Sequence, residues 1–306
     1  MTYPRCGFAA LPQGGAPSGP AKPDPSRLPA RPGKRALLVS VACAFVAWPA
    51  WCTEKPLWEL GAGVGLLRLP HYAGSDQYHG YALPLPYLVY RGEIFKADRD
   101  GARAVLFESD RVDFDLSASA SPPTRSEDNE ARRGMADLKP TFELGPNLNL
   151  TLQRGANWKL DLRLPVRAVA TVQSNPRFVG WNAQPNLNLD LARVGGSDWN
   201  LGVLGAASFA TRRVHGRIYD VALVDALPDR PLYRAGGGYG GAHVTLAMSR
   251  RFESVWAGFY TRYDRIDGAR FEASPLVRRK DNVSIGFAVS YVFATSRTMV
   301  DVADLP

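Results

Sequence analysis

The sequence predicts an all-β fold, a closed antiparallel transmembrane β-barrel of about twelve strands. Apolar and polar residues alternate over long stretches, most clearly from Trp158 to Val172, where every even-numbered residue is apolar. This stretch has fifteen residues, whereas a strand of a soluble domain usually has ~5 to 6 and a tilted membrane strand needs ~9 to 11. Aromatic residues also stand at many segment ends, where an amphipathic ring can lie at the level of the lipid head groups.

The N-terminal part of the chain predicts an exported protein. Residues 1–35 hold eight prolines between Pro4 and Pro32 and are expected to be disordered, whether they form a true leader or follow from a start codon assigned too far upstream. The apolar run Ala36–Trp48 follows basic residues and predicts a signal peptide over 36–52, cleaved after Cys52. A monotopic or buried helix is the alternative. The barrel is then expected over 53–293, followed by a tail over 294–306.

Loss of residues 1–52 changes the charge of the protein. It removes six of the 37 basic and one of the 29 acidic residues, so the net charge falls from +8 to +3. A charge this small gives no reason to expect nucleic-acid binding. All three cysteines lie in the same segment, and the mature chain is therefore expected to have neither disulfides nor thiol chemistry.

The strands are delimited by short turns that alternate with longer loops, as expected for the periplasmic and external rims of a barrel. The long loops are near 69–79, 121–137, 173–180, 211–238 and 267–282. The predicted strands are near 58–68, 80–90, 93–98, 102–108, 111–120, 138–152, 158–172, 181–191, 199–210, 239–250, 255–266 and 283–293.

An even number of strands places both chain ends in the periplasm. Two places depart from the regular pattern. Pro84 and Pro86 cannot donate to a ladder, so the second strand must be bulged or imperfectly paired there, and Ile218–Val224 could form a further short strand within its loop. A soluble periplasmic β-sandwich is the alternative fold, but a sandwich has no use for fifteen-residue strands with ring-bearing ends.

Charged residues on the polar faces of these strands are candidate lumen-lining residues. They could line a pore and select among solutes, or they could pair across strands and plug a narrow barrel. The narrow or plugged version is favoured. The candidates are Asp113, Asp115, Lys159, Asp161, Arg163, Arg167 and Asp190.

Other patterns give little support for catalysis. The chain has four histidines, none at a metal-ligand spacing, so no metal or other cofactor is expected. His71, Ser75, Asp76 and His79 share one loop and could form a hydrolase triad, but a hydrogen-bonded external loop is favoured because a triad is defined by geometry. The glycine-rich segment 236–241 is not followed by the Lys-Ser/Thr of a phosphate loop.

Four motifs in this order resemble the MltA-interacting protein (MipA/OmpV) family over Trp58–Phe293. They are Pro70–Ser75, Leu83–Pro86 leading to Tyr90–Gly92, Gly268–Ala269 followed by Ser274–Val277, and the final Tyr291–Phe293. The resemblance implies an outer-membrane barrel of a Gram-negative cell, embedded in outer-membrane lipid. The chain departs from most such barrels in the thirteen residues that follow Phe293.

The family takes its name from a member thought to scaffold a lytic transglycosylase and a bifunctional murein synthase. The resemblance therefore implies a scaffold without enzymatic activity, whose partners are a periplasmic murein hydrolase and synthase. A small-solute channel is the second expectation, and an outer-membrane hydrolase is the third.

Overall fold

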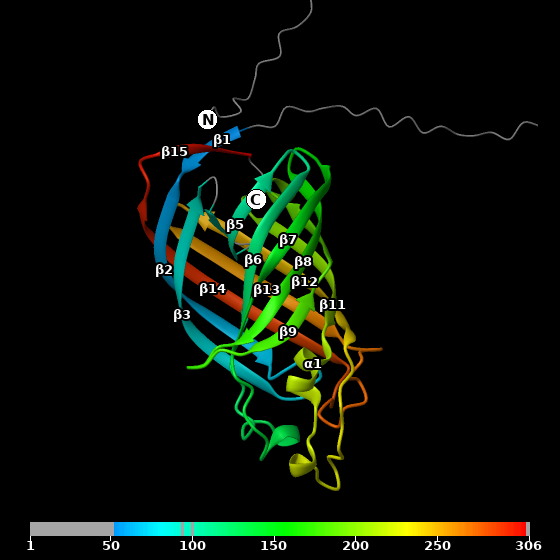
Figure 1. The fold of residues 1–306 in the computed structure, drawn as a ribbon. Coiled ribbons are helices and arrows are strands. Elements are labelled where there is room, and N and C mark those ends of the chain that lie inside the picture. The colour runs from blue at the N-terminus through cyan, green and yellow to red at the C-terminus, as the bar shows by residue number, and fades with distance from the viewer. Residues whose placement is uncertain (1–51, 93–94, 99–100, 304–306) are drawn as a thin grey trace, which may run out of the picture. The chain divides into compact units, whose positions relative to one another are not determined.

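A computed structural model describes residues 52–92, 95–98 and 101–303 (Figure 1). The predicted leader and almost all of the predicted signal peptide lie outside these residues. In the described chain, antiparallel strands form one large sheet and a separate two-stranded sheet, and helices are short. No helix within this part of the chain is long and apolar enough to span a membrane.

Every predicted strand is present in the large sheet. Its strands are β2 (Trp58–Pro70), β3 (Tyr78–Arg91), β4 (Phe95–Asp98), β5 (Gly101–Glu108), β6 (Val112–Ser121), β7 (Thr141–Arg154), β8 (Trp158–Thr171), β9 (Phe178–Ala183), β10 (Asn186–Leu191), β11 (Asn200–Ala210), β12 (Gly238–Phe252), β13 (Val255–Arg265) and β14 (Asp281–Thr295).

The strand pairing closes the sheet into a ring. The last strand, β14, pairs with the first, β2, and both β9 and β10 pair with β8 and with β11. β9 and β10 are thus two pieces of one strand, which gives the predicted twelve positions around the barrel. The sequence pattern does not predict the break between β9 and β10, which falls at Gln184 and Pro185. The ladder breaks there because proline lacks the N–H that it needs.

The alternation of the sequence becomes two faces of the wall. Outward-facing residues such as Leu164, Val166 and Phe287 are well exposed, as expected for side chains that meet lipid, whereas the inward Asp115 and Asp161 are almost completely buried. Because opposite residues of an antiparallel pair share a face, one strand's pattern sets that of its neighbours.

The two ends of the described part of the chain form a sheet that the sequence did not predict. β1 (Cys52–Pro56) pairs with β15 (Met299–Ala303), which lies in the expected tail. Hydrogen bonds from Leu57 N to Thr298 O (2.9 Å) and from Ser296 N to Trp58 O (2.9 Å) join this ribbon to the β2–β14 ladder. Figure 1 shows it at the end of the barrel opposite the helix α1. The even number of strands predicts that this end faces the periplasm.

Long loops pack together at the other end, which their length predicts to be external. The helix α1 (Arg212–Tyr219) buries His215 and Tyr219, which lie four residues apart on one side. The Tyr219 ring stacks on Phe271 with centroids 3.6 Å apart. We call this packed region the external cap; its buried apolar residues are Tyr72, Ala131, Leu138, Tyr219, Val221, Ala235, Ile266, Ala269, Phe271 and Leu276. Within the described chain, short 3-10 helices at Glu130–Arg132 and Leu223–Asp225 lie in these loops, and another at Val194–Gly196 lies in the β10–β11 turn at the opposite end.

The suggestion of a further strand over Ile218–Val224 is wrong. The helix continues to Tyr219, and within this segment only Val221 forms a bridge, with Tyr233. The apolar residues that suggested a strand are explained by the cap instead, because Tyr219 and Val221 are buried in it.

Candidate functional site

Polar side chains surround a cavity of about 360 Å³ in the barrel lumen. Six of the seven predicted lumen residues line it, and the seventh, Asp190, has its Oδ2 3.7 Å from the Arg163 guanidinium. The register explains this convergence. Lys159 lies opposite Asp190 across the β8–β10 pair, and Asp115 lies opposite Asn147 across the β6–β7 pair. The six cavity-lining candidates are Asp113, Asp115, Lys159, Asp161, Arg163 and Arg167.

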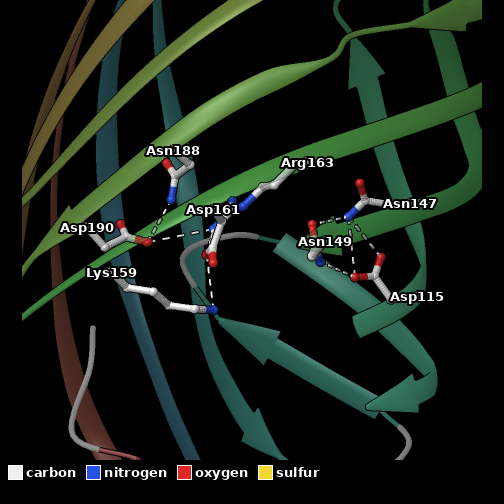
Figure 2. A network of polar contacts seen from close by, with 8 residues as sticks. All are labelled: Asp115, Asn147, Asn149, Lys159, Asp161, Arg163, Asn188 and Asp190. Carbon is white, nitrogen blue, oxygen red and sulfur yellow. Dashed lines mark hydrogen bonds and ion pairs between the residues drawn. The ribbon is translucent and has the colours of Figure 1, made fainter. Parts of the chain in front are cut away.

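The charged and amide side chains around this cavity form the lumen network. One part of it is an ion-pair cluster centred on Asp161 (Figure 2). Its Oδ2 lies 3.0 Å from Lys159 Nζ and 3.8 Å from the Arg163 guanidinium. Arg163 also approaches Asp190, which accepts a hydrogen bond of 2.7 Å from Asn188 Nδ2. Each cation of the cluster therefore has a carboxylate within 4 Å, and the Asp161 side chain is only 2% exposed.

The second part is an amide cluster around Asp115. Its carboxylate accepts hydrogen bonds from Asn147 Nδ2 at 3.3 Å and from Asn149 Nδ2 at 2.8 Å. Beside it, Arg167 Nε donates to Ser117 Oγ at 2.9 Å. Sequence reasoning considered only the charged residues and missed these asparagines, although their alternation with leucines marks the same inward face.

The loop that contains His71, Ser75 and Asp76 does not have the geometry of a catalytic triad. Ser75 is completely buried; its Oγ donates to Gln77 O (3.2 Å) and accepts from Asn129 Nδ2 (3.0 Å). The same amide nitrogen lies 3.1 Å from His71 Nδ1. Asn129 thus separates the serine from the histidine, while Asp76 is exposed. This arrangement fits the hydrogen-bonded external loop.

Burial in the cap changes the pKa values of two of its side chains. It lowers the pKa of His71 and raises the pKa of Tyr72 to about 12. The Tyr72 hydroxyl donates to Leu276 O at 2.8 Å. Among the described residues, no group of three or more His, Cys, Asp or Glu side chains is arranged to hold a metal ion.

Residues 61–293 match the family model described as "MltA-interacting protein MipA". The chain belongs to this family. The outer-membrane β-barrel expected from the sequence is thereby confirmed. In this MipA family member two of the motifs that suggested the family meet in the cap, because Tyr72 of the first bonds Leu276 of the third.

Two solved structures are similar to the MipA family member at low sequence identity. A "Bacterial polysaccharide outer membrane secretin" shares 8% identity with a TM-score of 0.38, over 78% of this chain and 99% of that one. The outer membrane phospholipase A from Escherichia coli shares 10% identity with a TM-score of 0.30, over 78% and 94%. Likenesses this distant transfer no function. No curated protein matches the chain.

Proposed function

We propose that this outer-membrane barrel is an interaction scaffold for murein-remodelling enzymes and has no enzymatic activity of its own. The observation that carries the proposal is the external cap. Val221, Phe271 and Leu276 are at most 1% exposed, so the loops over the external end form a packed core, which a freely permeable pore would not have.

The lumen network supports the same function. Lys159 and Arg163 lie beside Asp161 and Asp190, and paired charges of this kind fill a narrow barrel from within. A barrel that does not conduct still offers its periplasmic rim as a binding surface. The family description names interaction with MltA, and a periplasmic murein hydrolase and synthase are accordingly the partners we propose.

Affinity capture tests the scaffold. The detergent-solubilised barrel should retain a murein hydrolase and a murein synthase from a periplasmic extract, and both should be identified by mass spectrometry. The heat-unfolded chain on the same resin is the control. Equal recovery of these enzymes on the folded and the unfolded chain would remove the basis for the scaffold.

A small-solute channel is the second candidate, and the cavity of about 360 Å³ is the observation that favours it. Planar-bilayer recordings separate the two functions. We expect the wild-type barrel to conduct poorly. Steady, large, anion-selective conductance that is lost in Arg163→Ala would instead make the channel the better proposal.

A further inference from the structure

The barrel wall is interrupted beside β3. One edge of this strand pairs with β2 along its whole length, from Tyr78 to Tyr90. On the other edge only Tyr90 and Arg91 pair, with β4. Among the described residues, no strand pairs with this second edge over Tyr78–Val89. The cause is the shortness of the next hairpin, since β4 has 4 residues and β5 has 8.

Two prolines lie on this open edge. Arg91 N donates to Leu57 O at 2.8 Å, and in an antiparallel ladder the bonded residues alternate. The odd-numbered residues of β3 therefore bond β2, and the even-numbered Pro84 and Pro86 direct their backbone to the open edge. The β2–β3 register has no shift. The expected bulge is thus absent, and the pairing is incomplete only on the side where the prolines cost no hydrogen bond.

The opposite side of the interruption borders the lumen cavity. Beyond the pair of Arg103 with Ser117, β6 has no β5 partner. Arg103, Ser117 and Ala118 all line the cavity, and the next lumen-facing residue of β6, Ser119, is exposed. The cavity therefore reaches the strand edge at the level where the short hairpin ends.

The lumen face of β3 is apolar, unlike that of β6 to β8. Leu83 and Leu85 lie opposite Gly65 and Gly63 and face inward, and they are 45% and 37% exposed, about as much as the outward Leu60 at 38%. A Cβ at Gly65 would lie 2.5 Å from Leu85 Cδ1, so the glycine leaves room for this side chain. The outward row at this level, Ala82, Pro84, Pro86 and Leu88, is also apolar. The interruption consequently faces lipid.

Three side-chain oxygens on the polar side of the cavity accept no hydrogen bond from the described residues. Asn147 Oδ1, Asp161 Oδ1 and Asn186 Oδ1 are buried and have no hydrogen-bond partner within the described chain. All three residues line the cavity, and Asp161 and Asn147 are 2% and 8% exposed. A buried oxygen of this kind is stabilised by a ligand that carries N–H or O–H groups.

We propose that the lumen binds a single-chain amphiphile through this interruption. The acyl chain crosses the wall between β3 and β6 and lies against Leu83 and Leu85. The head group lies in the cavity, where the N–H donors of an ammonium group reach Asn147, Asp161 and Asn186. This binding site goes beyond the scaffold function and does not depend on it.

Two probe lipids with the same phosphate and acyl chain test the proposal. Lysophosphatidylethanolamine carries N–H donors in its head group, whereas lysophosphatidylcholine carries none. Native mass spectrometry of the mature barrel should show saturable binding of one ethanolamine lipid, about tenfold tighter than the choline lipid. Equal affinity, or loading of many lipids without saturation, would overturn the site.

Substitutions separate the two halves of the site. Leu83→Gln with Leu85→Gln should weaken binding of both lipids, whereas Asn186→Leu should abolish only the preference for the ethanolamine lipid. Ser249→Gln places a similar side chain on the lumen face of β12, opposite Asn200 and Gly258, which do not line the cavity, and should change neither.

A variant on β6 tests the same half of the site if the β3 double variant does not assemble. Ser119→Trp fills the interruption from β6 and leaves β3 intact, and it should also weaken binding of both lipids. Heat-dependent gel mobility shows which variants are folded. Unchanged lipid binding in the folded Ser119→Trp barrel would refute passage through the wall.

Discussion

At the residue scale, position along a strand decides the environment of a side chain. Leu162 and Arg163 are neighbours on β8, yet Leu162 lies opposite Leu150 and Leu187 on the outer face while Arg163 lies opposite Asn149 and Asn186 in the lumen. One step along the chain thus exchanges lipid for a polar network.

These two residues give the first prediction. Leu162→Arg should weaken assembly by ~2 to 4 kcal/mol if the position is near the bilayer midplane, because a cation then meets lipid. Arg163→Leu should bring no such cost of lipid exposure. Refolding titrations of both variants into vesicles measure the difference, and equal behaviour would show that the facing of β8 is wrong.

The second prediction concerns the ion-pair cluster. Asp161→Asn keeps the shape of the side chain but leaves Lys159 and Arg163 with a weaker partner inside the lumen, and should cost about 1 to 3 kcal/mol. The matched control is Asp198→Asn, whose partner Arg250 lies 3.0 Å away but whose own side chain is 71% exposed. An exposed pair contributes ~0 to 1 kcal/mol. Equal losses of unfolding free energy would argue against a low-dielectric cluster.

At the element scale, the cap depends on the short helix α1. His215 Nδ1 lies 2.8 Å from Gly236 O, and the ring packs edge-on against Phe271. Burial lowers the pKa of His215, and that of His71 in the neighbouring loop. The folded cap therefore favours neutral histidines.

The third prediction follows from the sign of these shifts. Above a pH of about 6.5, the ordinary histidine pKa, both states are neutral and the stability of the cap is complete. As the pH falls further, the unfolded loop binds protons first, so the cap loses stability. Hydrogen exchange of residues 212–219, corrected for the intrinsic rate, should be faster at pH 5 than at pH 8. His215→Gln should reduce the difference, and equal protection at both pH values would contradict it.

The ribbon at the chain ends gives the fourth prediction. Among the described residues β15 pairs with β1 alone, whereas the β2–β14 ladder that closes the barrel already ends at Thr295. Removal of residues 296–306 should leave a folded barrel with unchanged heat-dependent gel mobility. Truncation after Ile285 removes most of the closing ladder and serves as the control that should fail. Failure of the shorter truncation to assemble would assign the tail a role in folding.

At the scale of the whole molecule, closure leaves the ladder with one interruption and otherwise no free edge. Antiparallel pairs run from β2 round to β14 and back to β2. Within the described residues, the interruption leaves β3 over Tyr78–Val89 and the end of β6 beyond Ser117 without a second neighbour. A nearly continuous ladder satisfies the backbone within the membrane, where water cannot. The interruption falls where proline has already removed two donors.

The fifth prediction tests the closed barrel. Protein extracted from outer membranes should migrate faster on a gel when unheated than when boiled, because the closed ladder resists detergent at room temperature. Identical mobility in both lanes, together with recovery in the soluble periplasmic fraction, would contradict a membrane barrel.

The sequence by itself determined the strands and their faces. Alternation with period two is a local property of the extended chain, and all twelve strand positions therefore followed from the residues alone. The inward placement of Asp115 and Asp161 followed in the same way. So did the family, because its motifs are contiguous segments.

Only the tertiary structure decided what those faces meet. Asn129 lies between Ser75 and His71, and Tyr72 bonds Leu276, a residue 204 positions away. The β1–β15 ribbon, the cap and the open edge of β3 likewise depend on residues far apart in the chain. No local pattern encodes such contacts, since they arise when closure of the ring brings distant loops to one end and a short hairpin fails to cover its longer neighbour.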